Sequence, residues 1–139
     1  HSHVFSVLIM RFHEAVKKGF DEVTLWGSGK PRREFIFSED VADASIFMLE
    51  NTDKLENTHY NVGTGVDTSI RELALIIAQE TGFQGKIKWD TTKPDGRLEK
   101  LLESSKIKQM GWSPSISIED GVRITCKWYL ENMDKVRGI

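Results

Sequence analysis

Helical patterns alternate with short β-type runs along the whole chain of 139 residues, and this alternation constrains the fold more than any other feature. One helix is marked at both ends. Ser69 and Glu72 have the capping-box spacing, in which each side chain satisfies a free backbone amide, and Gly82 stops the pattern. Because the apolar residues between these positions recur at helical spacing, the sequence predicts an amphipathic helix there.

The same reasoning along the chain predicts five helices and four short strands. The predicted helices cover residues 4–18, 39–50, 70–81, 105–110 and 118–130. The predicted strands cover residues 22–26, 34–37, 60–62 and 86–90. Gly19 is expected to end the first helix, and Ser38 and Ser117 to cap the second and the last. We therefore expect an α/β chain, a small α+β unit that forms one domain, with strand directions left open.

Composition and charge exclude several classes of protein. The chain has 19 Lys and Arg against 21 Asp and Glu, so there is no basic excess and we expect no nucleic-acid partner. No apolar run approaches the ~20 residues of a membrane span and no export signal is visible, so we expect a cytoplasmic protein with no membrane partner. Cys126 is the only cysteine and is interpreted as a packing residue. The histidines lack metal-ligand spacing, so no metal site is predicted.

Two Gly-x-Gly motifs, at residues 27–29 and 63–65, are candidates for a phosphate-binding loop. A dinucleotide fingerprint needs a third glycine three positions later, and Arg32 and Thr68 stand there instead. The Tyr-x3-Lys pair of short-chain reductases is also absent from the sequence. Turn glycines are therefore the favoured interpretation of both motifs, and the chain is predicted to carry no dinucleotide site of its own.

The segment from Trp26 to Phe35, Trp-Gly-Ser-Gly-Lys-Pro-Arg-Arg-Glu-Phe, is the most informative part of the sequence. It places Arg33 at the start of a predicted strand, directly after a flexible loop. The planar guanidinium of an arginine can bridge two phosphate oxygens, which a lysine does less well. From spacing alone, a solvated charge at the strand end is still the favoured interpretation of Arg33, and a core or edge position is favoured for Trp26.

Several blocks taken together resemble one family in order and spacing. They are Ser2-His3-Val4, Arg11-Phe12-His13-Glu14-Ala15, Trp26 to Phe35, Ser38-Glu39-Asp40-Val41-Ala42-Asp43-Ala44, Asn61-Val62-Gly63-Thr64-Gly65, Ser69-Ile70-Arg71-Glu72-Leu73-Ala74, Lys93-Pro94-Asp95-Gly96 and Gly111-Trp112. The chain resembles the C-terminal half of the GDP-L-fucose synthases, which are extended short-chain dehydrogenases/reductases. This resemblance implies that residues 1–139 are the nucleotide-sugar-binding domain of a longer chain, with the N-terminal Rossmann half absent.

The resemblance also implies an activity. Full-length members convert GDP-4-keto-6-deoxy-mannose to GDP-L-fucose by C3/C5 epimerisation and NADPH-dependent reduction, and we expect a homodimer that binds NADPH mainly through the missing half. This segment alone is expected to be inactive. The family's epimerisation histidine corresponds to His3, a general acid that also lies toward the nicotinamide side of the cofactor site. The family's substrate contacts correspond to Arg11, Trp26, Arg33 and Asp95.

Two other functions stay open on the sequence. One is another NAD(P)-dependent nucleotide-sugar epimerase or a 4,6-dehydratase, although a dehydratase has no need of the histidine in Ser2-His3-Val4. The other is a stand-alone binding module that uses the fold without chemistry. An upstream glycine fingerprint together with a Tyr-x3-Lys pair would exclude the binding module.

Overall fold

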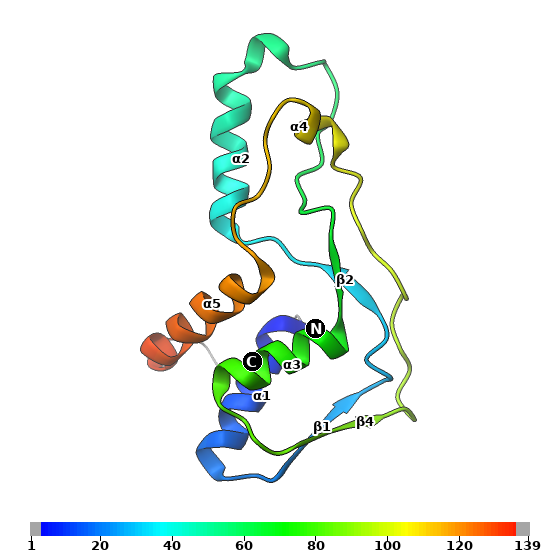
Figure 1. The fold of residues 1–139 in the computed structure, drawn as a ribbon, viewed down its shortest axis with the longest axis vertical. Helices are drawn as coiled ribbons and strands as arrows, with labels where there is room; N and C mark the ends of the chain where they lie inside the picture. Colours follow the sequence, from blue (N-terminus) through cyan, green and yellow to red (C-terminus); the bar gives the residue numbers. More distant parts are fainter. Residues whose placement is uncertain (1–3, 136–139) are drawn as a thin grey trace.

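The computed structural model describes residues 4–135, and within them five α-helices, four strands and two 3-10 helices follow one another in mixed order (Figure 1). The helices are α1 (Val4–Lys18), α2 (Ser38–Glu50), η1 (Thr52–Lys54), α3 (Ile70–Thr81), α4 (Ser105–Gln109), α5 (Ile118–Asn132) and η2 (Met133–Lys135). The strands are β1 (Glu22–Trp26), β2 (Arg32–Glu34), β3 (Asp67–Ser69) and β4 (Lys86–Asp90). The predicted α/β class is confirmed.

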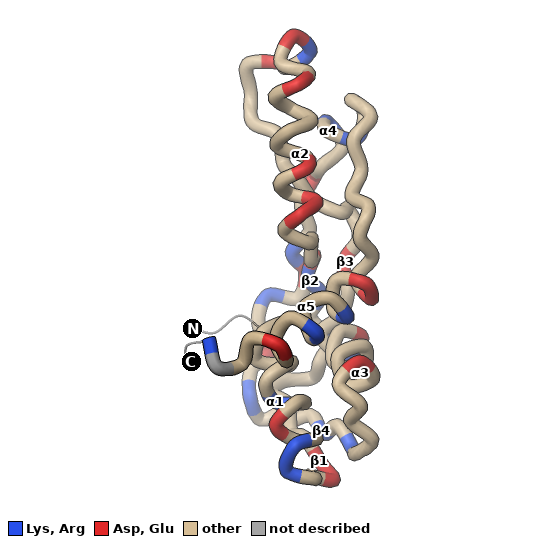
Figure 2. Tube along the Cα trace, turned by 90° about the vertical axis from the view of Figure 1, so that its left-hand side faces the viewer, with Lys and Arg blue, Asp and Glu red and all other residues tan. Residues whose placement is uncertain are grey.

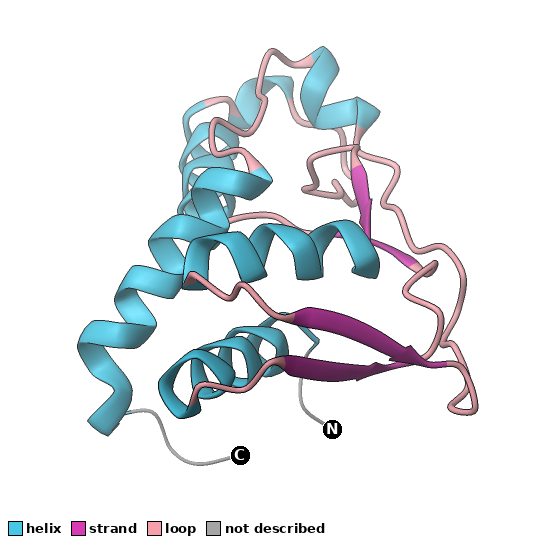
Figure 3. Ribbon diagram, turned by 60° about the horizontal axis from the view of Figure 1, so that its bottom comes forward, coloured by secondary structure: helices cyan, strands magenta, loops and turns pink. Residues whose placement is uncertain are grey.

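The strands form two separate pairs. β1 and β4 run parallel, with Trp26 opposite Asp90, whereas β2 and β3 run antiparallel, with Arg33 opposite Thr68. A parallel pair needs a long crossover, and residues 27–85 provide it. Because β1 and β4 are parallel, their carboxyl ends lie at the same edge, where both arrowheads point in Figure 3.

The main core lies where α1, α3 and α5 pack on one another and on the β1–β4 pair (Figure 1). Its fully buried large side chains include Phe12, Leu73, Ile77 and Val122. Ile87 and Trp89 of β4 pack against this core from one face of the strand, as their alternation with polar residues predicts. Cys126 is buried in the same core.

A second, smaller cluster lies toward the opposite end of the elongated molecule, next to α2 and α4, where acidic residues follow one side of α2 (Figure 2). Its buried members are Ala44, Ile107 and Trp112. Two carboxylates of α2 fix the chain that leads into α5. Asp40 accepts hydrogen bonds from the Ser115 amide and hydroxyl, both at 2.9 Å, and from the Ile116 amide at 3.1 Å. The Trp112 indole donates to Asp43 at 2.8 Å.

The helix ends follow the sequence signals closely. The Glu72 amide donates to the Ser69 hydroxyl at 3.1 Å and the Ser69 amide to the Glu72 carboxylate at 2.8 Å, so the capping box is confirmed. Gly82 ends α3 in the left-handed conformation with φ 77°. Ser117 caps α5 by accepting from the Asp120 amide at 3.1 Å.

Three local predictions are wrong. The second strand covers residues 32–34 instead of 34–37, and the third covers residues 67–69 instead of 60–62. Both predicted segments have β-type sequences, but only Glu34 lies in a ladder, opposite Asp67, and no strand of the described part lies beside residues 35–37 or 60–62. β2 and β3 pair with each other instead, and the Arg32–Asp67 ion pair joins them. Ser38 is the first residue of α2 and not its cap, because Phe37 holds the cap position without a side-chain hydrogen bond.

Candidate functional site

The loop after β1 and the turn after β4 enclose a cavity of about 200 Å³. They meet because the two parallel strands end at the same edge, which is where larger α/β sheets commonly bind ligands. The residues that line the cavity are Val4, Trp26, Gly29, Pro31, Arg33, Ile70, Pro94, Asp95 and Gly96. Three of the predicted substrate contacts, Trp26, Arg33 and Asp95, therefore lie at one cavity.

Arg33 presents its guanidinium to this cavity without an acidic partner. Its Nη1 donates to the Arg32 carbonyl at 2.6 Å, and among residues 4–135 no carboxylate lies within ion-pairing distance of it. Arg33 also lines an adjacent cavity of about 600 Å³, together with Lys100. A planar fork of donors next to an ammonium group suits a phosphate or diphosphate ligand.

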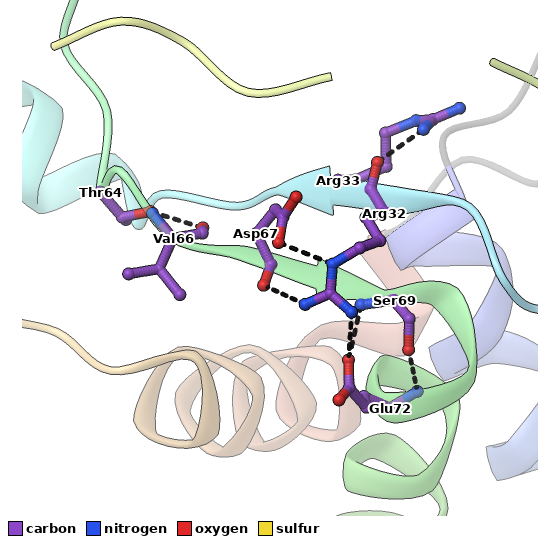
Figure 4. Close-up of polar contacts among 7 residues, drawn as sticks. All are labelled: Arg32, Arg33, Thr64, Val66, Asp67, Ser69 and Glu72. Carbon is purple, nitrogen blue, oxygen red and sulfur yellow. Dashed lines mark hydrogen bonds and ion pairs between the residues drawn. The ribbon is translucent and has the colours of Figure 1, made fainter. Parts of the chain in front are cut away.

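Arg32 has the opposite environment (Figure 4). Its Nε donates to the Asp67 carboxylate at 2.7 Å, its Nη2 to the Asp67 carbonyl at 2.9 Å, and its Nη1 lies 3.4 Å from the Glu72 carboxylate. The hydrogen bond that Arg32 donates to the Asp67 carboxylate raises the pKa of Arg32. Arg32 therefore links β2 to β3 and to the first turn of α3, and its donors are used within the fold.

Trp26 is the last residue of β1, and 68% of it is exposed. The ammonium group of Lys93 lies 5.7 Å from the centroid of its ring. The structure therefore places Trp26 at a strand end next to the cavity and outside the core. A large exposed aromatic face beside a cavity is suited to stacking on a base or a sugar ring.

Asp95 is held by Ser28 across the cavity rim. The Ser28 hydroxyl donates to one carboxylate oxygen at 2.6 Å and the Ser28 amide to the other at 2.8 Å. These two hydrogen bonds, the one from the hydroxyl foremost, lower the pKa of Asp95. Gly27 permits the contact, because its φ is 80° and a Cβ there would lie 2.4 Å from the Asp95 carboxylate. Sequence reasoning missed Ser28, whose partner is 67 residues away and leaves no local signal.

The second glycine motif also holds a carboxylate of the chain itself. The Gly65 amide donates to Glu34 at 2.7 Å, and a Cβ on Gly63 would lie 2.5 Å from the same carboxylate. In the first motif, the Ser28 amide is taken by Asp95. In each of the two glycine motifs, a backbone amide therefore donates to a carboxylate of the chain itself.

Of the other two predicted site residues, one lies away from the cavity and one lies outside the described residues. Arg11 donates from Nη1 to the Thr24 carbonyl at 3.0 Å and is not among the lining residues. His3 lies outside the described residues, so its role stays a prediction. In the described part of the chain, no three His, Cys, Asp or Glu side chains are grouped to hold a metal ion. No helix between residues 4 and 135 is long and apolar enough to cross a membrane.

Comparison with known proteins relates the chain to enzymes of nucleotide-sugar chemistry. Residues 1–63 match the NAD dependent epimerase/dehydratase family. The chain is 50% identical over 132 residues to a putative GDP-L-fucose synthase 2 of Arabidopsis thaliana, covering 95% of this chain and 40% of that protein. It is 47% identical over 144 residues to the GDP-L-fucose synthase of Escherichia coli (strain K12), covering 99% and 45%. The chain thus spans less than half the length of these curated relatives.

Solved structures share the fold. A GDP-L-fucose synthetase from Naegleria fowleri bound to NADP matches 99% of this chain and 43% of its own, with a TM-score of 0.87 and 25% identity. The GDP-mannoheptose C4 reductase of Campylobacter jejuni with NADP bound matches 93% of this chain and 45% of its own, with a TM-score of 0.81 and 34% identity. In sequence and in fold, the chain is therefore similar to a C-terminal part of the GDP-L-fucose synthases.

Proposed function

We propose that residues 1–139 are the nucleotide-sugar-binding part of a GDP-L-fucose synthase. The full-length enzyme would epimerise GDP-4-keto-6-deoxy-mannose at C3 and C5 and then reduce it with NADPH to GDP-L-fucose. The observation that carries this proposal is the guanidinium of Arg33, which lines the cavity beside Trp26 and has no carboxylate partner within residues 4–135. Two relatives named GDP-L-fucose synthase, at 50% and 47% identity, support the choice of nucleotide sugar.

In this proposal four of the predicted residues act on the substrate. Arg33 binds the diphosphate, Trp26 lines the nucleotide-sugar pocket, and Arg11 makes a further contact to the substrate. His3 returns a proton to the sugar carbon next to the ketone and lies toward the nicotinamide. An imidazole that titrates near neutral pH suits that proton transfer.

The remaining parts of the proposal concern the whole protein. NADPH binds mainly to the portion of the protein outside these residues, because both glycine motifs of the described part hold internal carboxylates. The full-length enzyme is a cytoplasmic homodimer. Analytical ultracentrifugation of that enzyme tests the oligomeric state.

An NADP-dependent reductase of another GDP-sugar is the second candidate. The GDP-mannoheptose C4 reductase of Campylobacter jejuni supports it, being 34% identical over most of this chain. It ranks second because the relatives named GDP-L-fucose synthase share more of the sequence, 47% and 50%. The two candidates differ in whether the sugar is epimerised before reduction.

One experiment separates the candidates. The full-length protein is incubated with GDP-4-keto-6-deoxy-mannose and NADPH, and the sugar product is identified by NMR. The expected result is GDP-L-fucose, formed with one NADPH oxidised per sugar. A reduced product that keeps the configuration at C3 and C5 would favour the second candidate. If NADPH is oxidised neither with this substrate nor with another keto GDP-sugar, both candidates are overturned.

A further inference from the structure

The loop after β1 and the turn after β4 are joined by the carboxylate of Asp95, and each of its two oxygens accepts a hydrogen bond from Ser28. Asp95 accepts from the amide and the hydroxyl of Ser28 at 2.8 and 2.6 Å. The same hydroxyl oxygen accepts from the Lys30 amide at 3.1 Å. The hydroxyl hydrogen is directed at Asp95, since an ionised carboxylate can only accept.

The loop is also fixed from the side of α3. Arg71 donates from Nη2 to the Ser28 carbonyl at 2.8 Å, and its amide donates to the Gly29 carbonyl at 2.9 Å. Its guanidinium lies 4.8 Å from the Trp89 ring centroid. A Cβ on Gly29 would lie 2.7 Å from the Trp89 ring, so the loop sits tightly on this support. Ser28 thus belongs to a loop whose position the fold determines.

The turn has much less support of its own. Residues 91–100 are all exposed. Within the described chain, the hydrogen bonds from residues 94–96 to other segments are the two that Asp95 makes with Ser28. The turn nevertheless reaches Arg33, because a Cβ on Gly96 would lie 3.3 Å from its Nη2 atom. The contact between Ser28 and Asp95 holds this turn on one side, and the hydrogen bond from the Arg32 amide to the Leu98 carbonyl at 2.7 Å holds the chain just beyond it.

We propose that Ser28 is a positioning residue for GDP-sugar binding, which acts through Asp95 to hold the 94–96 turn at its distance from Arg33. The inference rests on the proposed function. It also gives Asp95 a defined task. A carboxylate repels a diphosphate, so Asp95 aids binding of an anionic substrate as the anchor of the turn, and its negative charge is not what the ligand requires.

A double-mutant cycle in the full-length protein tests this inference, with GDP as the probe and isothermal titration as the readout. Ser28→Ala and Asp95→Ala should each weaken GDP binding by about tenfold, the size expected when a hydrogen bond to a charged group is lost. The double variant should bind no more weakly than Asp95→Ala, because the hydroxyl bond that Ser28→Ala removes is already lost when Asp95 is replaced. The KM for the GDP-sugar should rise in proportion, with little change in kcat.

Two conservative variants distinguish positioning from charge. Ser28→Thr keeps the hydroxyl and should keep wild-type affinity to within about threefold. Asp95→Asn keeps an acceptor for the Ser28 amide but removes the charge, and should lose much less affinity than Asp95→Ala. The matched control is Ser117→Ala, which removes a similar serine–aspartate contact, to Asp120 at 2.8 Å, away from the cavity. This control should leave GDP affinity unchanged.

Two results would overturn the inference while leaving the proposed function in place. In the first, the losses of Ser28→Ala and Asp95→Ala multiply in the double variant, as they do for independent contacts. In the second, Asp95→Asn binds as weakly as Asp95→Ala, which would make the charge itself the contact. A wild-type protein that does not bind GDP would instead overturn the proposed function, and the inference with it.

Discussion

Arg32 and Arg33 are neighbours in β2, yet their guanidinium groups lie on opposite sides of the strand and have opposite kinds of partner (Figure 4). Successive side chains of a strand alternate between its faces. Arg32 pairs with Asp67 and Glu72 inside the fold, whereas Arg33 lines the cavity and has no carboxylate partner in the described part. Two identical cations one residue apart therefore allow charge and position to be tested separately.

Replacing Arg33 should weaken binding of the GDP-sugar. A charge-assisted hydrogen bond from a guanidinium contributes about 1.5–3 kcal/mol, so Arg33→Ala should lower GDP affinity by roughly one to two decades. Arg33→Lys should recover only part of this loss, because an ammonium lacks the planar fork. Competition binding with GDP on the full-length variants measures both effects.

Arg32→Ala is the matched control for the Arg33 variants. It should lower the thermal midpoint, because β2 loses its ion pairs to β3 and α3. The loss should be modest, since partly exposed ion pairs contribute about 0.2–1 kcal/mol each. GDP affinity should stay within about twofold of wild type. Equal losses of affinity at both arginines would indicate a diffuse basic patch.

His3 is predicted to act mainly in proton transfer, and its place toward the nicotinamide is expected to add little to NADPH affinity. In the full-length enzyme, His3→Ala or His3→Gln should slow C3/C5 epimerisation by about 10²–10⁴-fold, the usual cost of losing a positioned general acid. NADPH affinity should change little. Mass spectrometry of solvent deuterium incorporated into the sugar measures the exchange, and incorporation at the wild-type rate would remove His3 from the mechanism.

The thiol of Cys126 should be unreactive in the folded protein. It is 5% exposed, and burial, with a smaller effect from Glu80, raises its pKa to about 11. The thiolate is the reactive form, so little of it is present at neutral pH. Ellman's reagent should label the native protein slowly and the urea-unfolded protein rapidly. Rapid labelling of the native chain would mean that α5 separates readily from the core.

Asp40 should make the stability of the chain depend on pH in acid. Burial raises the pKa of Asp40, but the hydrogen bonds from Ser115 and Ile116 outweigh burial, so its net pKa lies below the ordinary 3.8. A carboxyl whose pKa is lower in the folded state stabilises the fold above its unfolded pKa. That stabilisation is lost as the pH falls through the folded pKa.

Asp40→Asn isolates this contribution. The variant should be less stable than wild type at pH 7, because the amide replaces an acceptor of three hydrogen bonds with a weaker one. Its free energy of unfolding should fall less than that of wild type between about pH 5 and pH 2. Urea unfolding of both proteins across that range measures the difference. Parallel pH profiles would show that Asp40 is not the titrating group.

The helices could be predicted from the sequence because their signals are local. Ser69, Glu72 and Gly82 all belong to α3 and its two ends. As predicted, Ser69 and Glu72 form the capping box and Gly82 ends the helix. Residues 35–37 and 60–62 form no strand, since a strand exists only where a partner lies beside it, and β2 ends at Glu34. The sequence pattern shows β propensity but does not show which segments meet.

The candidate site divides in the same way. Trp26 and Arg33 are seven residues apart, and a shared pocket for them follows from the loop between them and from the family resemblance. The contact of Ser28 with Asp95 spans 67 residues and depends on the parallel pairing of β1 with β4, which the sequence left open. The ion pair that makes Arg32 structural likewise depends on β3, at a position where no strand is predicted.

The pairing of Trp26 with Asp90 fixes how far the loop after β1 and the turn after β4 extend beyond the strands. A slip of one residue between β1 and β4 would move the turn by about 3.3 Å along the strand, too far for a hydrogen bond to Ser28 to survive. The same slip would turn Ile87 and Trp89 away from the core they pack against. The apolar packing of β4 therefore stabilises the register that the site requires. A chain with the two strands shifted would lose the contact between loop and turn and would also expose the apolar face of β4 to water.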